Sequence, residues 1–351
     1  KKKLLWKKKN KVLDGVGINS YENDHNTIGL AKSADYESWL QTGKDKHLFC
    51  ELKAHGTAVG LPGDGDMGNS EVGHNALGSG QIVDQGAKLV NSVLADKSIF
   101  ASESWSTIKA KCLSGSTLHF VGLLSDGGIH SNINQLKEIL LKCGEDNIPS
   151  VRMHVLTDGR DVGQRTSRAG DDEKWESGFI QQLEDALSAA AGANQKGNAD
   201  YKIASGGGRM YVTMDRYESD WNIVKRGFDA MVHGSIDESI VSEMHDGRKN
   251  EKGETYKGYY TSMREWSDAV DSIYSEKSNH SKDDQFYPPF VITDDTPTES
   301  NPNGTPVGKV EDNDVVVCFN YRGDRSIEIS RAFTEGKAFD SSCFDRDIAK
   351  R

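Results

Sequence analysis

One pattern recurs along the chain and decides the class of fold it can adopt: an apolar run, a loop rich in glycine and aspartate, and an amphipathic segment. The run Leu118–Leu124 (LHFVGLL) precedes the loop SDGGIH and a segment in which apolar residues recur at helical spacing from Ile133 to Cys143. The runs 151–156 (VRMHVL) and 315–319 (VVVCF) precede the loops TDGRDVG and NYRGDR. Strands that alternate with helices predict an α/β fold with a mainly parallel sheet and helices on both faces.

The second half of the chain extends this pattern and contains two segments outside it. Apolar residues at helical spacing predict a helix from Trp221 that ends near Gly234, and 201–204 is predicted as a short strand before SGGGR. The stretches 189–200 (AAAGANQKGNAD) and 275–285 (SEKSNHSKDDQ) have low complexity and are predicted to be surface loops. A chain of 351 residues suits two domains that each bury a core.

Composition and charge narrow the range of partners. The net charge of −11 argues against general affinity for nucleic acid, although an acidic protein can still contain a basic pocket for an anionic ligand. The five cysteines are scattered without a CxxC spacing, which indicates reduced thiols in a cytoplasmic protein. No apolar run approaches the roughly 20 residues that a membrane span requires, so we expect no membrane partner.

Charged residues gather on four of the loops that follow predicted strands, where ligands bind in parallel α/β sheets. The planar guanidinium of arginine binds two oxygens of a phosphate or carboxylate at once. The loops carry Asp126, His130, Asp158, Arg160, Asp161, Arg209, Asp215, Arg216, Arg322 and Arg325. We call the five arginines of this set the arginine cluster, and we predict that it binds a small ligand carrying both phosphate and carboxylate.

Two residues of these loops have alternative roles. Asp161 would stay ionised beside arginines, so it either accepts a proton from a substrate hydroxyl or, as the residues alone favour, orients Arg160 through a salt bridge. His130 either binds phosphate, shuttles a proton or has a structural role at the start of a helix. The residues themselves leave these alternatives open.

Residues 60–75 (GLPGDGDMGNSEVGHN) place Ser70 in a glycine-rich stretch, with Glu71 and His74 close behind. Serine is a poor nucleophile at neutral pH and needs a base or a metal ion to remove its proton. By composition alone the stretch also fits a surface loop rich in glycine and aspartate. Asp14, in VLDGVG, is placed either as a ligand for a hard cation at a strand end or as a helix cap or turn residue.

The string MGNSEVGHNALGSG closely resembles the nucleophile loop of cofactor-independent phosphoglycerate mutases, and the resemblance extends from about Asp14 to about Phe333. Four further motifs follow in the order that this family shows: VGLLSDGGIHS, HVLTDGRDV, ASGGGRMYVTMDRY and FNYRGDR. Their residues are most like those of plant and trypanosomatid members. The resemblance implies interconversion of 3-phosphoglycerate and 2-phosphoglycerate in glycolysis and gluconeogenesis, through a phosphoserine at Ser70. It also implies an alkaline-phosphatase-like domain, split in sequence, into which a transferase domain is inserted.

The resemblance also implies boundaries and roles. Residues 1–83 would be the first part of the metal-binding phosphatase-like domain, and 84–351 the phosphoglycerate-binding transferase domain with an incomplete end. Asp14 and Ser70 would each bind one of two divalent metal ions, Mn²⁺ or else Mg²⁺ or Co²⁺. Asp161 would help proton transfer, and the full-length protein would be a monomer. The implied substrate-binding residues are His130, Arg160, Asp161, Arg209, Arg216, Arg322 and Arg325.

The chain departs from the family at its end. Family members continue beyond Arg351 with most of the metal ligands, so the resemblance predicts a C-terminally truncated chain that is inactive on its own. The segment up to residue 83 would then lack the rest of its sheet, and we expect it to expose apolar surface or to be mobile. Two other functions stay open: a related metal-dependent phosphohydrolase, and a non-catalytic truncated paralogue that binds small anions.

Overall fold

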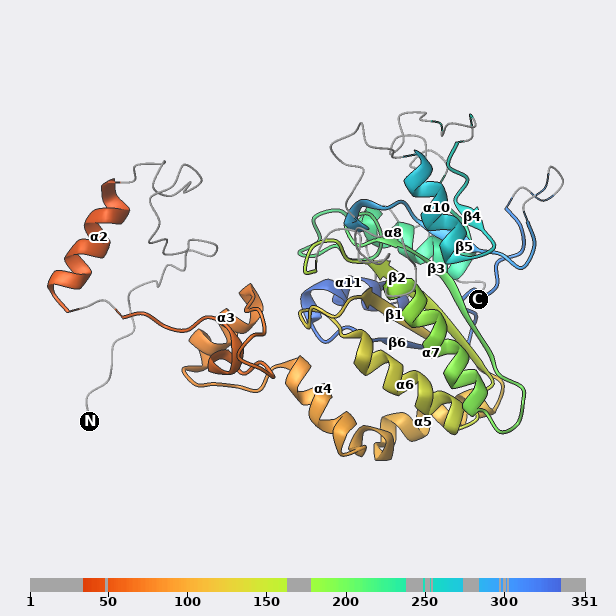
Figure 1. Cartoon of the computed structure of the whole chain (residues 1–351), viewed down its shortest axis with the longest axis horizontal. Coiled ribbons are helices and arrows are strands. Elements are labelled where there is room, and N and C mark those ends of the chain that lie inside the picture. Colours follow the sequence, from red (N-terminus) through yellow and green to blue (C-terminus); the bar gives the residue numbers. More distant parts are fainter. Residues whose placement is uncertain are drawn as a thin grey trace.

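The computed structural model describes residues 34–47, 50–162, 178–237, 255–273, 284–296 and 303–335, and the single positions 249, 253, 298 and 301. Its centre is a six-stranded sheet in the order β4-β5-β3-β2-β1-β6 (Figure 1). The strands are β1 Leu118–Leu124, β2 Ser150–Thr157, β3 Asp200–Gly208, β4 Tyr259–Tyr260, β5 Phe290–Ile292 and β6 Val315–Cys318. β6, β1, β2 and β3 run parallel, while β5 is antiparallel to β3 and parallel to β4. The prediction of a mainly parallel sheet is confirmed.

Helices cover both faces of this sheet, as predicted (Figure 1). Successive residues of a strand point to opposite faces, so Phe120 and Val121 of β1 belong to two different apolar clusters. The cluster around Phe120 includes side chains of α5 (Glu103–Leu113), α6 (Ile133–Glu145), α7 (Phe179–Ala193) and α10 (Met263–Ile273). The cluster around Val121 includes α8 (Trp221–Phe228), the π-helical turn η4 (Asp229–His233) and α11 (Ile327–Thr334).

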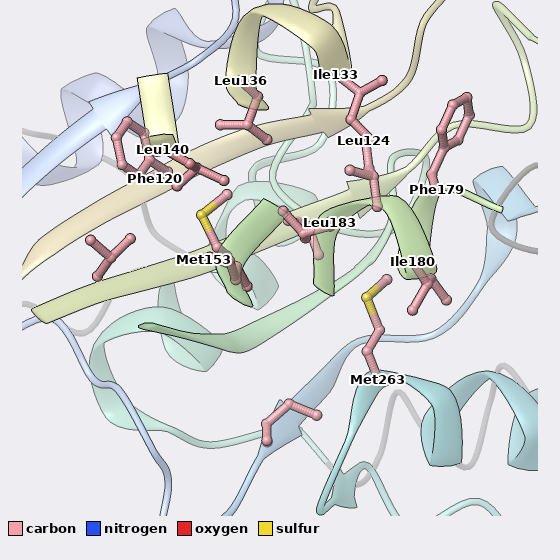
Figure 2. Close-up of a cluster of buried hydrophobic side chains, with 14 of the residues drawn as sticks. Phe120, Leu124, Ile133, Leu136, Leu140, Met153, Phe179, Ile180, Leu183 and Met263 are labelled. Carbon is pink, nitrogen blue, oxygen red and sulfur yellow. The ribbon is translucent and has the colours of Figure 1, made fainter. Parts of the chain in front are cut away.

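The larger cluster fixes the neighbouring strands β1 and β2. Figure 2 shows Leu136 and Leu140 of α6 and Leu183 of α7 beside Phe120 and Met153 of the sheet. All five side chains are almost completely buried. Burial of one such side chain stabilises the fold by roughly 1.5–3 kcal/mol. The core therefore holds β1 and β2 firmly, and with them the start of each loop that follows.

Two predictions of surface loops are corrected. Asp284 and Gln285, at the end of the predicted loop 275–285, are buried in the short helix η5 (Asp284–Phe286), while 275–283 lie outside the described residues.

Helix α7 corrects the other prediction. It continues to Ala193, so the first residues of the predicted surface loop 189–200 are helical. Alanine has the highest helix propensity, and Ala190 is fully buried. Gly144 of α6 permits the close contact between the two helices, because a Cβ there would lie 1.9 Å from the carbonyl oxygen of Ala190.

The N-terminal part of the described chain, up to residue 101, contains helices and no strand. Its elements are α2 (Ala34–Asp45), η1 (Gly56–Val59), α3 (Ser70–Ser79), α4 (Gly86–Ala95) and η2 (Ser98–Ala101). Its exposed apolar side chains include Trp39, Leu52, Met67, Leu77, Ile82 and Val83. This is the apolar surface expected for the segment up to residue 83, whereas a domain boundary at that position stays a prediction. Within the described ranges, none of the helices has both the length and the apolar character that crossing a bilayer requires.

Candidate functional site

Arg209, directly after β3, connects the loops that follow three neighbouring strands. Its side chain is 2% exposed. Nη1 donates hydrogen bonds to Asp158 Oδ1 at 2.7 Å and to Asp161 Oδ2 at 2.5 Å, both in the loop after β2. Nη2 lies 2.7 Å from Nε2 of His130, in the loop after β1. The carboxyl ends of β1, β2 and β3 therefore meet as the sequence predicted.

The contact with Arg209 also fixes the state of His130. A guanidinium can only donate, so Nε2 of His130 accepts the hydrogen bond and the proton of the neutral ring lies on Nδ1. Burial, followed by the charges of Arg209, Arg322 and Arg325, lowers the pKa of His130 to about 2. A ring that stays neutral at physiological pH is a poor proton shuttle but can donate one hydrogen bond from Nδ1. The geometry thus favours the ligand-binding role among the alternatives for His130.

Asp158 organises the loop after β2, a role that the sequence interpretation did not assign to it. Its carboxylate is 1% exposed. Besides Arg209, Oδ1 accepts hydrogen bonds from the backbone N–H groups of Arg160 at 3.2 Å and Asp161 at 3.0 Å. This is the local turn that aspartate makes with backbone groups two and three residues ahead. The Asp-Gly pair in TDGRDVG was the signal that could have predicted it.

Asp161 and Arg160 do not pair with each other, which corrects the interpretation that the residues alone favoured. Asp161 pairs with Arg209, and its Oδ2 also lies 3.6 Å from Nε2 of His130. Arg160 is exposed, and its Nη1 lies 3.4 Å from the sulfur of Met210. Arg160 is thus exposed and has no carboxylate partner among the described residues.

Arg325, in the loop after β6, is buried and short of negative charge. Its Nη1 donates to the carbonyl oxygen of Met214 at 2.6 Å, while its Nε is buried with no hydrogen-bond partner in the described part of the chain. Burial lowers its pKa to about 10, and the charges of Arg216 and Arg209 add to this effect. A guanidinium in such surroundings favours the arrival of an anion.

Arg216 and Arg322 both pair with Asp324, which lies between Arg322 and Arg325 in the sequence. Arg322 Nε lies 2.9 Å from Asp324 Oδ1, and Arg216 Nη1 lies 3.7 Å from Asp324 Oδ2. Arg216 also stacks on the ring of Tyr217, at 5.1 Å from its centroid. Arg322 is buried and Arg216 is partly exposed. The four loops thus bring all five residues of the arginine cluster to one edge of the sheet.

Two carboxyls support the segment that carries Arg216. Asp215 is buried and its Oδ2 accepts a hydrogen bond from the backbone of Asp220 at 2.9 Å. Glu328 of α11, which the sequence interpretation missed, accepts one from the backbone of Glu218 at 2.9 Å. Burial raises the pKa of Glu328, and the neighbouring Asp215 raises it further.

Asp126, in the loop after β1, is exposed at the surface.

Ser70 is the first residue of α3. The side chain of Asn69 caps this helix by accepting hydrogen bonds from the backbone of Glu71 at 3.0 Å and Val72 at 3.2 Å. Ser70 Oγ lies 3.4 Å from Nδ1 of His74, but the same Nδ1 lies 2.7 Å from the carbonyl oxygen of Ser70. Because the carbonyl can only accept, Nδ1 carries a proton and cannot serve as the base for the serine.

Glu71 connects the helix of Ser70 to the arginine cluster. Its Oε2 lies 3.2 Å from Nε of Arg322. Burial raises the pKa of Glu71, and the positive charge of Arg322 opposes this rise. The predicted nucleophile therefore begins a helix that contacts the predicted anion site.

The described residues do not fit a complete metal site. No group of three or more His, Cys, Asp or Glu side chains that could hold a metal ion occurs in the ranges that the structure describes. Asp14, the other predicted ligand, lies outside these ranges. The assignment of Asp14 and Ser70 to two metal ions stays a prediction.

Comparisons with known proteins agree with this arrangement. A family described as BPG-independent PGAM N-terminus (iPGM_N) matches residues 90–350. A 2,3-bisphosphoglycerate-independent phosphoglycerate mutase of Trypanosoma brucei brucei is 45% identical over 325 residues, which are 92% of this chain and 50% of the relative. The corresponding protein of Ricinus communis is 42% identical over 335 residues, 95% of this chain and 51% of the relative.

A solved structure is also similar. The phosphoglycerate mutase of Leishmania mexicana, determined at low cobalt concentration, superposes with a TM-score of 0.66 at 40% identity, covering 84% of this chain and 45% of that one. The chain spans about half the length of the curated relatives it matches. The resemblance inferred from the motifs is confirmed, and the chain belongs to the family of BPG-independent phosphoglycerate mutases that is defined by its N-terminal region, iPGM_N.

Proposed function

We propose that this chain supplies the nucleophile and the phosphoglycerate-binding part of a 2,3-bisphosphoglycerate-independent phosphoglycerate mutase, an isomerase. Its ligands would be 3-phosphoglycerate and 2-phosphoglycerate. The observation that carries the proposal is the convergence of the arginine cluster at one sheet edge, in contact with the helix that begins at Ser70 through the pair Glu71–Arg322. Names of relatives at 42–45% identity support the same reaction.

The members of the cluster would act on the ligand in different ways. Arg325 lacks a carboxylate partner among the described residues and Arg160 is exposed, so both can take phosphate or carboxylate oxygens without breaking an ion pair. His130 would donate one hydrogen bond from Nδ1. These groups are all donors, which suits a ligand whose charged groups only accept.

Asp161 is the proposed proton carrier. Its carboxylate lies between the Arg209 guanidinium at 2.5 Å and the His130 ring at 3.6 Å. A carboxylate at this place can accept the proton of a glycerate hydroxyl and return it later. This role would be in addition to the ion pair with Arg209.

Ser70 would be the residue that is phosphorylated. Its activation is assigned to groups outside the described residues, because Nδ1 of His74 is engaged with the Ser70 carbonyl oxygen at 2.7 Å. We propose two divalent ions for that task, Mn²⁺ or else Mg²⁺ or Co²⁺, with Asp14 among their ligands. A metal ion lowers the pKa of a bound hydroxyl.

Binding is the part of this function that the described residues support by themselves. Titration of 3-phosphoglycerate into the 351-residue chain by calorimetry should give binding that inorganic phosphate suppresses. Arg325→Met should weaken binding at least tenfold, since a hydrogen bond to a charged group contributes about 1.5–3 kcal/mol. Arg264→Met is the matched control, because Arg264 pairs with Glu184 on the surface of α7. No binding by the wild-type chain, or equal losses in both variants, would contradict the proposal.

Turnover needs a separate assay. Formation of 2-phosphoglycerate is coupled to enolase with Mn²⁺ present and 2,3-bisphosphoglycerate absent. The chain is tested alone and joined to the C-terminal half of the Trypanosoma brucei relative. We expect turnover in the joined protein and its loss in Ser70→Ala. Unchanged turnover in that variant would refute the assignment of the nucleophile.

We also propose that the full-length protein is a monomer in the cytoplasm. Cys50, Cys112, Cys143 and Cys318 are free thiols in the described ranges, which supports a reducing compartment. Light scattering after size exclusion tests the monomer, and imaging of the tagged protein tests the compartment.

A further inference from the structure

Tyr321 carries a polar atom that the proposed function has not used. It lies between β6 and Arg322, and its backbone N–H donates to the carbonyl oxygen of His130 at 2.9 Å. Its side chain packs beside Gly86 at the start of α4, where a Cβ would lie 2.9 Å from that of Tyr321. The ring is therefore fixed in place. Its hydroxyl oxygen is buried and has no hydrogen-bond partner among the described residues.

A buried hydroxyl without a partner destabilises a fold, and such groups are rare enough in native structures to need an explanation. Burial raises the pKa of Tyr321, and the charges of Asp66 and Asp161 raise it further. The hydroxyl therefore keeps its proton at neutral pH and is available as a donor. Asp66 belongs to the glycine-rich stretch before Ser70, and Asp161 belongs to the loop after β2. The Tyr321 hydroxyl therefore interacts electrostatically with both the Ser70 segment and the β2 loop.

The surroundings of Tyr321 include a small cavity of about 30 Å³. Asn69 and Glu71, the residues on either side of Ser70, line this cavity together with Gly128, Tyr321 and Arg322. The hydroxyl oxygen itself lies beside Gly128, 3.9 Å from where a Cβ of that residue would be. A space of this size holds roughly one water molecule. It has room for a single oxygen of a ligand rather than for a whole one.

We propose that Tyr321 is a further substrate-binding residue, whose hydroxyl donates a hydrogen bond to one oxygen of the phosphoglycerate at the junction between the Ser70 helix and the arginine cluster. This inference rests on the proposed function. An anionic oxygen fits this place because Arg322, which lines the same cavity, carries a guanidinium that only donates and already balances the Glu71 carboxylate there. A phosphate or carboxylate oxygen can accept from several donors at once.

Tyr321→Phe removes only the hydroxyl and keeps the ring that packs beside Gly86. Calorimetric titration of 3-phosphoglycerate into the 351-residue chain should show a dissociation constant about tenfold larger, or more, in the variant. The denaturant midpoint should stay unchanged or rise, because the folded state loses an unpaired buried group. A purely structural role for the hydroxyl would instead lower the midpoint and leave binding unchanged.

Tyr201→Phe is the matched control. The hydroxyl of Tyr201 donates to the carbonyl oxygen of Ile148 at 2.8 Å, at the opposite ends of the strands from the arginine cluster. This variant should lower the denaturant midpoint and bind 3-phosphoglycerate like the wild type. The two tyrosines are therefore expected to give opposite results in the two measurements.

The outcomes separate the two proposals. If the wild-type chain binds no 3-phosphoglycerate, the proposed function and the role of Tyr321 both fail. If the wild type binds and Tyr321→Phe binds equally well, only the role of Tyr321 fails, and the hydroxyl contacts a resident water instead. Weaker binding at an unchanged midpoint supports the role of Tyr321.

Discussion

The pair Arg209–Asp158 offers the sharpest test of how this site is built. Both side chains are at most 2% exposed, and they are joined by a hydrogen bond of 2.7 Å. Removing one partner of a buried ion pair leaves an unpaired charge and costs about 3–5 kcal/mol. Arg209→Met leaves the Asp158 carboxylate in that state. In Asp158→Asn the Arg209 guanidinium keeps only the Asp161 carboxylate as a negatively charged partner, and the amide oxygen at position 158 can still accept from the loop backbone.

The double variant decides between a coupled pair and two independent residues. If the two losses were additive, Arg209→Met with Asp158→Asn would cost about 6–10 kcal/mol, most of the 5–15 kcal/mol that keeps a typical domain folded. If the pair is coupled as the geometry indicates, the double variant should cost little more than either single one. The coupling free energy should then be about 3 kcal/mol.

Urea denaturation followed by circular dichroism measures the free energy of unfolding for the wild type, both single variants and the double one. Arg331→Met serves as the control, since Arg331 and Glu218 form a partly exposed pair whose loss should change stability far less. An unfolded double variant, or losses that add within about 0.5 kcal/mol, would refute the coupling.

Further predictions concern pH and helix packing. Burial lowers the pKa of His119, His130 and His154 in the folded chain. Below about pH 6.5 the unfolded chain therefore binds more protons than the folded one. As the pH falls through this range, the free energy of unfolding should decrease by up to ~4 kcal/mol per pH unit. Urea midpoints at pH 7, 6 and 5 check this, and a flat profile would contradict it. Gly144→Ala should cost roughly 1–3 kcal/mol, because its Cβ would clash with the backbone of α7. Gly192→Ala, with open space around its Cβ in α7, should stabilise the chain by about 0.5–1 kcal/mol, and thermal unfolding compares the two.

The parallel part of the fold followed from the sequence because its signals are long and local. Leu118–Leu124 is buried along its whole length, as a continuous apolar run predicts for a strand covered on both faces. The edge strands gave no such signal. β4 has two residues and β5 three, and their pairing depends on contacts across the sheet that no local pattern encodes. The helical part of 189–200 was missed for a different reason. The alanine-rich end of α7 was interpreted as a low-complexity loop, although alanine favours helices.

The histidines inside two apolar runs formed another signal that the sequence interpretation did not use. Nε2 of His119 lies 3.2 Å from Asp314 Oδ2, and Nδ1 lies 2.9 Å from Nε2 of His154. Nδ1 of His154 lies 2.8 Å from the hydroxyl of Ser205. Burial lowers the pKa of both rings, so both are neutral. With His119 Nε2 donating to Asp314, Nδ1 of His119 accepts from Nε2 of His154, and Nδ1 of His154 accepts from the Ser205 hydroxyl. Partners from three strands and a loop make this network, so the sequence could indicate buried histidines but not their contacts.

Within the candidate site, the sequence identified the right loops but could not distinguish among their arginines. Arg209 is held by Asp158, Asp161 and His130, so its charge is largely balanced inside the protein. These contacts fix three loops, while Nε of Arg209 is buried without a hydrogen-bond partner among the described residues. The assignment of Arg209 to substrate binding stays a prediction. Arg325 is the opposite case, since burial has removed its water and no described carboxylate has replaced it. The paired charge of Arg209 holds the loops together, whereas Arg325 and Arg160 have no carboxylate partner among the described residues and can pair with an anion.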